Sequence, residues 1–365
     1  NMKNGNNMKV TGTQDQFDFS NGYHLGGAPL SDRLRQRIND KFVVRLDKEW
    51  GGRSLLHGRT PGAGAVRLDG NDYLNVTGHP RILEAQINAI KGDRHQVVQA
   101  SIFHLDKHPS RRFEHELAQW IGHEDGMLCQ SGYMANVGLL QSIADENTPI
   151  YIDALAHTSL WEGAKAAKAP AILFRHNDPE HLAKQMQRHG QGIVAVDSVY
   201  STTGALCPLT EFVEVAEQHN AMIVVDESHS LGTHGPMGAG LCAQLGLTDR
   251  VHFITASLAK AFAGRAGFFT SSHGFRNYVL SECFPTVFSS SLLVHEIEAL
   301  AATLDVIKKA DRARERLFEV TRRVRDSLTE LGYPIFQGSE QIISLESGTE
   351  ANKIGRASCR ERVSS

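Results

Sequence analysis

From about residue 125 the chain consists of short apolar runs that alternate with helical patterns. The runs are rich in β-branched residues, and most are followed at once by Asp, Ser, His or Gly. Continuous apolar strands that alternate with helices are typical of βα units around a mainly parallel sheet. Ligands of open α/β sheets bind beyond the carboxyl ends of the strands, so a functional site is expected on the loops that follow these runs. The predicted strands are TPIYID (148–153), AILF (171–174), GIVAVD (192–197), AMIVVD (221–226), VHFIT (251–255) and GFFT (267–270).

The N-terminal part of the chain predicts a polar arm and one helix. Residues 1–30 show no sustained period, which is typical of a loose terminus. Ser31 can cap a helix, and apolar side chains follow it at four-residue steps until the pattern ends before Gly51. This spacing predicts an amphipathic helix. Its apolar positions are Leu34, Ile38, Phe42 and Leu46.

Three further elements are predicted from periodicity. A helix is expected near residues 111–121, and a long helix or a helix pair is expected between residue 291 and Gly332. The strand-like run QIISLES (341–347) follows and would open a small C-terminal α+β domain. The chain stops at Ser365, so this domain is expected to be incomplete.

Composition and charge exclude several function classes. Apolar residues make up 41% of the chain and charged residues 22%, as in ordinary globular proteins. The formal net charge of −3 provides no basic field for a nucleic acid or an anionic membrane surface. No apolar run approaches the roughly 20 residues that span a bilayer, and the Asn-rich start lacks the apolar core of a signal peptide. A cytoplasmic location is therefore expected.

Metal and disulfide chemistry are not indicated. The five cysteines are scattered and show no CxxC spacing, which fits reduced thiols. His104 and His108 in HLDKH lie at helical spacing, but no third ligand is placed nearby. We therefore expect no metal site.

The strongest chemical signal is TASLAKAFAGRAG (255–267), in which Lys260 follows a buried-type strand among small residues. A lone lysine in such a turn is usually a surface residue. A partly desolvated lysine near other cations, however, has a lowered pKa and can act as a nucleophile. Lys260 is therefore a candidate for imine formation with a flat cofactor.

A second signal is AMIVVDESHSLGTHG (221–235), where an apolar strand ends at Asp226 and His229 follows. A carboxylate at a strand end is often only a helix cap. Paired with an imine-forming lysine, it can instead hold the ring nitrogen of pyridoxal phosphate protonated, which makes that cofactor an electron sink. His229 is either a structural histidine or a hydrogen-bond partner of the cofactor phenolate.

Three weaker signals stand at the ends or starts of other elements. In CQSGYMANVGLL (129–140) a turn with Ser131 and Gly132 opens an apolar helix, and helix N-termini bind phosphate. His157 follows the strand end of YIDALAHTSLWEGA, where it is either a packed histidine or a ring that stacks on a cofactor. Ser198 stands just beyond another strand, in VDSVYSTTG.

Together these segments resemble the α-oxoamine synthases, which are pyridoxal-phosphate enzymes of the fold type I aminotransferase superfamily. The resemblance runs from NDYL (71–74) to about residue 352. It implies an α/β fold, with a mainly parallel central sheet flanked by helices and a small C-terminal α+β domain. It also implies a pyridoxal 5'-phosphate cofactor and a homodimer with shared active sites.

The resemblance also implies roles for individual residues. Lys260 would form the imine, Asp226 would contact the pyridine nitrogen, and His157 would stack on the ring and help to fix the substrate carboxylate. His229 and Ser198 would lie on the phenolate side of the ring. The remaining implied contacts are Gly132, Tyr133 and Ser257 at the phosphate, Asn71 near the substrate carboxylate, and Ser289 and Ser290 at the phosphate of the partner subunit.

Within this family the chain is most similar to the quorum-sensing autoinducer synthases that make α-amino or α-hydroxy ketones. The expected reaction is the decarboxylative condensation of an amino acid, of 2-aminobutyrate or S-adenosylmethionine type, with a medium- or long-chain fatty acyl-CoA. Residues 100–120 depart from the glycine-rich GSR-type loop of the biotin-pathway synthases and of 2-amino-3-ketobutyrate ligase. The alternatives are 8-amino-7-oxononanoate synthase, another α-oxoamine synthase, or a catalytically idle protein with this fold.

The C-terminus departs from the family. The family continues past SLESGTEAN (344–352) with an arginine for the substrate carboxylate, whereas KIGRASCRERV (353–363) resembles the translation of a sequencing adapter. We therefore expect four parts. They are an N-terminal arm and helix (1–75), a large pyridoxal-phosphate-binding domain (76–305), the start of a small C-terminal domain (306–352) and a non-native tail (353–365).

Overall fold

The computed structural model describes residues 24–25, 28–43, 62, 64, 70–92, 97–336, 338 and 340–344. The chain divides into two compact units, one built mainly from Asn1–Thr60 and the other mainly from Pro61–Ser347. In the first unit, β1 (His24–Leu25) pairs antiparallel with β2 (Ala28–Pro29). The helix α1 (Asp32–Ile38) and a π-helical turn, η2 (Asn39–Val43), follow.

The predicted first helix begins where its cap indicates. The Ser31 hydroxyl accepts a hydrogen bond from the Leu34 backbone N–H at 3.3 Å, as an N-cap side chain does. The helical path runs through Ile38 and continues as η2 to Val43. The rest of the predicted helix, from residue 44 to residue 50, lies outside the described residues.

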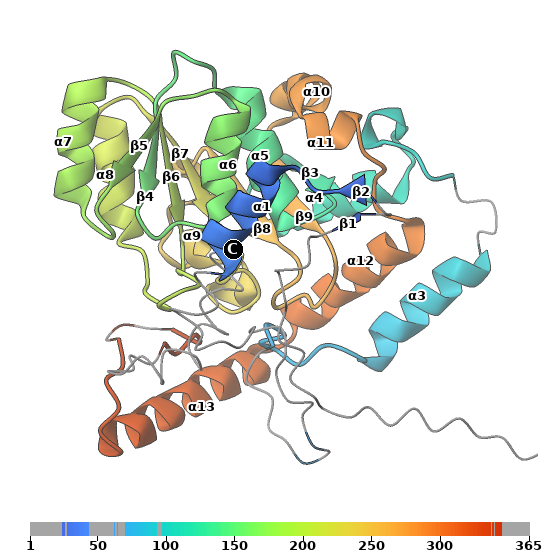
Figure 1. Ribbon diagram of the computed structural model, residues 1–365. Helices are drawn as coiled ribbons and strands as arrows, with labels where there is room; N and C mark the ends of the chain where they lie inside the picture. The colour runs from blue at the N-terminus through green and yellow to red at the C-terminus, as the bar shows by residue number, and fades with distance from the viewer. Residues whose placement is uncertain are drawn as a thin grey trace, which may run out of the picture. The chain divides into compact units, whose positions relative to one another are not determined.

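The second unit contains a seven-stranded sheet in the order β3-β9-β8-β7-β6-β4-β5 (Figure 1). The strands from β8 to β5 run parallel to one another, and β9 is antiparallel to both of its neighbours. The expected α/β fold with a mainly parallel sheet is therefore confirmed. The strands are β3 (Asp125–Cys129), β4 (Ile150–Asp153), β5 (Ala171–Phe174), β6 (Ile193–Asp197), β7 (Met222–Asp226), β8 (Phe253–Ser257) and β9 (Gly267–Ser271).

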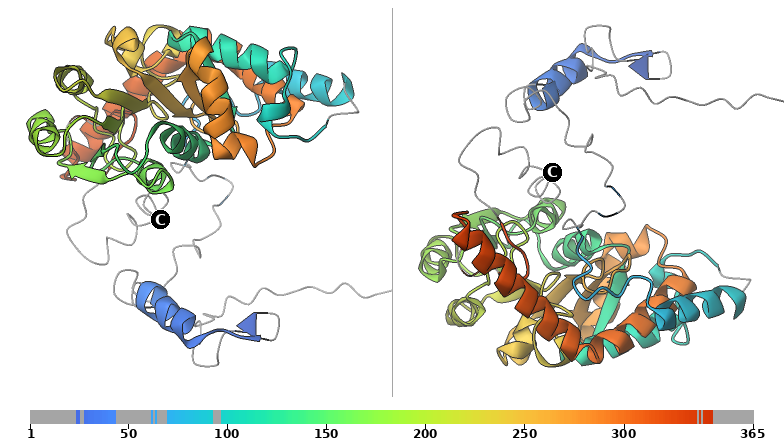
Figure 2. Two further views of the ribbon diagram at one scale, coloured as in Figure 1. Left: turned by 90° about the horizontal axis from the view of Figure 1, so that it is seen from above. Right: turned by 90° about the horizontal axis from the view of Figure 1, so that it is seen from below.

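Helices pack on both faces of this sheet, as the two further views in Figure 2 show. The helices α3 and α12 lie side by side, and α5 packs on β3, β8 and β9. Three short 3₁₀ turns, η4 (Ser101–Phe103), η5 (Pro236–Gly238) and η6 (Thr248–Arg250), connect other elements. The helices are α3 (Pro80–Gly92), α4 (Pro109–Ile121), α5 (Gly132–Ile143), α6 (Thr158–Ala166), α7 (Pro179–His189), α8 (Leu209–Gln218), α9 (Leu241–Gln244), α10 (His273–Glu282), α11 (Phe284–Val287), α12 (Val294–Lys308) and α13 (Asp311–Glu330).

The C-terminal elements agree with the sequence only in part. The helical region after residue 291 is a pair, α12 and α13, that breaks at Lys309 and Ala310. The strand predicted at 341–347 is not formed over residues 341–344, which are irregular, and residues 345–347 lie outside the described part of the chain. The predicted tail at 353–365 also lies outside it.

The sequence predicts neither a membrane-spanning segment nor a metal site. None of the helices that the structure describes is long and apolar enough to cross a membrane. Within the same residues, no group of three or more His, Cys, Asp or Glu side chains could hold a metal ion. Cys129, Cys207, Cys242 and Cys283 are buried and free.

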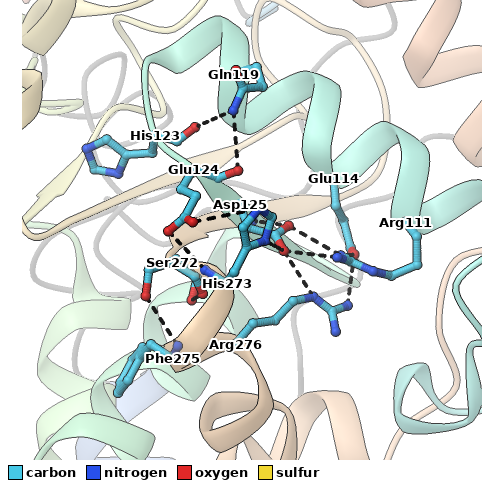
Figure 3. A network of polar contacts seen from close by, with 12 residues as sticks. Arg111, Glu114, Gln119, His123, Glu124, Asp125, Ser272, His273, Phe275 and Arg276 are labelled. Carbon is cyan, nitrogen blue, oxygen red and sulfur yellow. Dashed lines mark hydrogen bonds and ion pairs between the residues drawn. The ribbon is translucent and has the colours of Figure 1, made fainter.

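A buried ion-pair network fixes the start of β3 (Figure 3). Asp125 and Glu114 are almost fully buried, and two guanidinium groups, from α4 and α10, bind them. Arg111 Nη2 lies 2.9 Å from Asp125 Oδ2, and Arg276 Nη2 lies 3.0 Å from Glu114 Oε2. Glu114 also accepts the backbone N–H of Leu128 at 3.0 Å, so one carboxylate joins a helix, a strand and a second helix.

Burial works against the ionisation of the Asp125 carboxyl group, and hydrogen bonds compensate for this effect. Burial alone would raise the pKa of Asp125, but hydrogen bonds from Arg111 and from the Gly126 backbone hold it below its ordinary value. The pKa of Arg111 is raised, because its bonds to Asp125 and Glu114 outweigh its own desolvation. The network therefore depends on all of its charges being present together.

We expect Glu114→Gln to lower the free energy of unfolding by about 3 kcal/mol, because it leaves buried guanidinium groups without their counter-charge. Urea denaturation followed by circular dichroism measures this loss. The matched control is Glu116→Gln on the same helix, where an exposed glutamate meets Arg112 at 4.0 Å. That change should stay within about 0.5 kcal/mol. Equal effects of the two substitutions would contradict a special role for the buried network.

Candidate active site

A cavity of about 230 Å³ lies beyond the carboxyl ends of β6, β7 and β8. Polar residues at the ends of strands and on the loops after them form most of its wall, as expected for a parallel sheet. Seven of the predicted site residues line it, and so does Ser131, which the sequence pointed to as the start of a helix. The seven are Gly132, Tyr133, His157, Asp226, His229, Ser257 and Lys260.

The sheet register places two carboxyl groups side by side at this cavity. Asp197 ends β6, Asp226 ends β7, and the two residues are direct partners in the parallel pairing. The Asp226 carboxylate accepts hydrogen bonds from Asn136 Nδ2 at 2.7 Å and from the Ser228 N–H at 2.8 Å. Burial, reinforced by the charge of Asp226, raises the pKa of Asp197 well above its ordinary value. Asp197 is therefore the member of the pair that favours its protonated form.

Lys260 lies half-buried on the turn between β8 and β9 and lines the same cavity. Burial lowers the pKa of its ammonium group, and the nearby Asp226 carboxylate opposes this shift only in part. A lysine with a lowered pKa reaches its neutral, nucleophilic form more readily. The cavity thus brings an amine and a buried carboxylate together.

Hydrogen-bond contacts hold both the backbone and the ring of His157 at the cavity. Its backbone N–H donates to both oxygens of Asp197, at 3.2 Å each, and its Nδ1 lies 2.6 Å from Ser159 Oγ at the start of α6. Burial lowers its pKa, with the charge of Lys260 acting in the same direction. Its ring meets that of Tyr133 edge-on, with centroids 6.4 Å apart. The imidazole is therefore fixed in position and favours the neutral form.

His229 is the most deeply buried ring of the site. Burial, reinforced by electrostatic interactions with Lys260 and His157, lowers its pKa to about 3. The ring is therefore neutral at any physiological pH. Its Nδ1 lies 2.6 Å from the hydroxyl oxygen of Tyr73.

A helix N-terminus and a tight backbone contact close the end of the cavity at α5. The Ser131 hydroxyl caps this twelve-residue helix by accepting the Met134 N–H at 3.2 Å. A Cβ at position 132 would stand 2.5 Å from the Cβ of Ser257, so only glycine allows α5 to approach the end of β8. Free N–H groups at such a start attract anions.

Four predicted site residues do not line the cavity. Ser198 is buried, and its hydroxyl donates to the Asp226 carbonyl at 2.9 Å. Asn71 is exposed, and its carbonyl accepts the Tyr73 N–H. Ser289 and Ser290 are exposed beside the bridge that pairs Ala100 with Ser290.

Several residues that were not predicted from the sequence also line the cavity, namely Asp197, Val199, Ser201 and Ser228. The most informative is Ser201, whose buried hydroxyl oxygen has no hydrogen-bond partner among the described residues. It stands three residues after Ser198 in the same motif, so the motif itself pointed to the correct loop. An unpaired buried hydroxyl on a cavity wall is suited to a bound polar group.

Comparison with known proteins identifies the family to which this chain belongs. The sequence pattern of the aminotransferase class I and II family matches residues 63–363. The chain belongs to this family. It is 43% identical to a CAI-1 autoinducer synthase of Vibrio campbellii (strain ATCC BAA-1116), over 324 residues that cover 89% of this chain and 82% of that protein.

Other relatives in this family are more distant. An 8-amino-7-oxononanoate synthase of Anaeromyxobacter dehalogenans (strain 2CP-C) is 32% identical over 307 residues, covering 83% of this chain and 77% of that protein. The solved serine palmitoyltransferase of Sphingomonas wittichii has a TM-score of 0.77 at 24% identity, covering 87% of this chain and 83% of that one. The second comparison supports the fold alone.

Family membership confirms three expectations from the sequence. The chain has the fold type I architecture, it is related to the α-oxoamine synthases, and it is a pyridoxal-phosphate-dependent enzyme. The cavity fits that cofactor, because it offers an amine, a buried carboxylate, a helix N-terminus and the unpaired hydroxyl of Ser201. The roles of individual residues remain predictions.

For this aminotransferase-family chain, Gly132→Ala should weaken the binding of pyridoxal phosphate by tenfold or more. The new methyl group would collide with Ser257 and separate α5 from β8, which should also cost about 1–3 kcal/mol of stability. Fluorescence titration with the cofactor and thermal unfolding measure both effects. Gly274→Ala within α10 is the control, because a Cβ there meets nothing within 4 Å. Tight cofactor binding by the Gly132 variant would contradict a role for the close contact between α5 and β8 in binding the cofactor.

Proposed function

We propose that this chain is an α-oxoamine synthase that makes an α-aminoketone precursor of a quorum-sensing autoinducer. The substrates would be an amino acid, of 2-aminobutyrate or S-adenosylmethionine type, and a medium- or long-chain fatty acyl-CoA. The observation that carries this proposal is the convergence of Lys260, Asp226 and His157 on one cavity in a chain 43% identical to a CAI-1 autoinducer synthase. A cytoplasmic location stays a prediction from the sequence.

The proposed reaction balances with these two substrates alone. A carbon–carbon bond forms between the amino acid Cα and the thioester carbonyl carbon, and the C–S bond breaks to release the CoA thiol. The α-carboxylate leaves as CO₂, and a proton returns to Cα. When bound, pyridoxal phosphate supplies an electron sink that stabilises negative charge at Cα.

The residues of this chain would divide the remaining work. Lys260 Nζ, with its lowered pKa, would take the Cα proton. Asp226 would keep the cofactor's ring nitrogen protonated, and Asn136 and Ser228 hold its carboxylate in place for this. His157 would stack on the ring and orient the substrate carboxylate. The N-terminus of α5 and Ser257 would hold the phosphate.

The function is tested by product analysis. Protein loaded with pyridoxal phosphate is incubated with either amino donor and a panel of medium- and long-chain acyl-CoA thioesters, and CoA release and ketones are measured. We expect a long-chain α-aminoketone. A product formed only with other acyl donors would favour the 8-amino-7-oxononanoate synthase alternative, and no CoA release with any pair would favour the idle protein.

Lys260→Ala should abolish ketone formation, with a loss of at least about 10³-fold, because the amine that moves the Cα proton is removed. In the unmodified protein, borohydride treatment with bound cofactor followed by peptide mapping should label Lys260. Lys184→Ala, at an exposed position of α7, is the control and should retain activity. A label on another lysine would contradict the assignment.

We also propose that two copies of the chain form the working enzyme. Large apolar side chains are exposed on two segments that the bridge between Ala100 and Ser290 brings together. Exposed apolar patches of this kind mark association surfaces. Ser289 and Ser290 lie on this face, which supports their predicted role at the partner's phosphate. The exposed apolar residues are Val97, Val98, Phe103, Leu105, Phe284 and Phe288.

Leu105→Glu should convert the dimer to a monomer, because it places a charge on a surface that must lose water. Light scattering after size-exclusion chromatography measures the mass. Leu105 is 81% exposed, and the control Leu331→Glu changes a residue that is 73% exposed at the end of α13. A monomeric wild-type protein, or an unchanged mass in the Leu105 variant, would contradict this dimer face.

A further inference from the structure

His229 is connected to a residue that stands 156 positions earlier in the chain. The hydroxyl oxygen of Tyr73 lies 2.6 Å from His229 Nδ1. Tyr73 belongs to the turn that precedes α3, and it does not line the cavity, whereas His229 does. The bond therefore links the imidazole to a residue outside the cavity wall.

A third residue, Gln341, completes the contact from the C-terminal part of the chain. Its Nε2 donates a hydrogen bond to the His229 backbone carbonyl, and its side chain lies close enough to Tyr73 to influence the pKa of the phenol. A carbonyl oxygen only accepts, so the amide nitrogen must face it, and this fixes the orientation of the amide. The same nitrogen has a second proton that it can donate to the Tyr73 oxygen.

The pKa of Tyr73 agrees with this direction of donation. Burial raises the pKa of its phenol, so the hydroxyl keeps its proton at physiological pH. The Gln341 side chain acts in the opposite sense and lowers the pKa, as a donor near the phenol oxygen does. Among the described residues, His229 Nδ1 is the hydrogen-bond partner of the Tyr73 hydroxyl, so the retained proton is donated to that nitrogen.

The proton count then determines the tautomer of the imidazole. A neutral histidine carries one ring proton, and a nitrogen that accepts a hydrogen bond cannot carry it. Nδ1 accepts from Tyr73, so the proton resides on Nε2. Nε2 has no hydrogen-bond partner within the residues that the structure describes, and the ring lines the cavity.

We propose that Tyr73 and Gln341 are positioning residues that hold His229 as the Nε2–H tautomer and so provide the cavity with a fixed, uncharged hydrogen-bond donor. The inference rests on the proposed function in one respect, since the acceptor would be an oxygen of the bound cofactor or substrate. The charged and titratable groups around the ring are Lys260, His157 and Asp226. None of them replaces Tyr73 at Nδ1.

The tautomer can be measured without the cofactor. Full-length protein labelled with ¹⁵N at histidine gives nitrogen shifts that separate Nδ1–H from Nε2–H rings, and comparison with the spectrum of His229→Gln identifies the signal of His229 among the 18 histidines. We expect a single Nε2–H form in the wild type. Tyr73→Phe, which removes one oxygen, should give a mixture of both tautomers.

Two further variants, one a control and one expected to change the tautomer, complete this test. Tyr278→Phe removes a hydroxyl that donates to the Ser142 carbonyl at 2.8 Å, and it should leave the signal of His229 unchanged. Gln341→Glu should shift the population toward Nδ1–H, because a carboxylate accepts the Tyr73 proton and Nδ1 must then donate to the phenol oxygen. Circular dichroism confirms that each variant is folded before its spectrum is interpreted.

A second measurement connects the tautomer to the site. Tyr73→Phe should weaken pyridoxal phosphate binding about tenfold, by loss of one oriented hydrogen bond in a buried site, while Tyr278→Phe leaves it unchanged. An Nδ1–H ring in the wild type, or an unaltered tautomer in Tyr73→Phe, would overturn the inference. Absence of cofactor binding in the wild type would instead overturn the proposed function, because the tautomer is determined in cofactor-free protein.

Discussion

The parallel register of β6, β7 and β8 is the constraint on which the site depends. It pairs Asp197 with Asp226 and Asp226 with Thr255, so that three strands deliver polar side chains to one edge of the sheet. A shift of one residue would turn Asp226 toward the opposite face. Asn136 on α5 fixes the arrangement, since it donates to Asp226 at 2.7 Å and accepts from Thr255 at 2.6 Å. The helix that would hold the phosphate is thereby bound to the strand that carries the carboxylate.

The electrostatics of the cavity follow from that register. Two carboxyl groups on neighbouring strands cannot both ionise easily in a buried place, and the raised pKa of Asp197 shows which of them favours its proton. Burial lowers the pKa values of His157, His229 and Lys260 as well. The site thus combines a carboxyl group that favours its proton with two histidine rings that favour the neutral form and an amine that loses its proton readily, and such an amine is suited to proton transfer at carbon.

The sequence predicted six strands of the sheet because each is a continuous apolar run, and it missed β3 because DGMLC is not one. Gly126 is required there, since a Cβ would stand 2.1 Å from Phe268 Cζ, and Asp125 is stabilised by arginines that are distant in sequence. Seven predicted site residues line the cavity, because strand ends are recognisable in a sequence. Ser201 was missed because Ser198 is nearer to the strand end, and only the turn in three dimensions brings the later hydroxyl to the wall.

The surroundings of His229 could not be predicted from the sequence, because segments that are distant along the chain form them. Two adjacent acidic residues at the end of β7 have different roles. Asp226, the last residue of the strand, lines the cavity, whereas Glu227 turns to α9 and accepts the Leu241 and Cys242 N–H groups at 2.7 Å each. This anchors the start of the loop that carries His229. Hydrogen bonds from Tyr73 and Gln341 then hold the ring and the carbonyl of His229 from parts of the chain that no local pattern relates to it. A donor with a defined tautomer therefore requires segments from both ends of the larger unit to fold around the sheet before the cavity is complete.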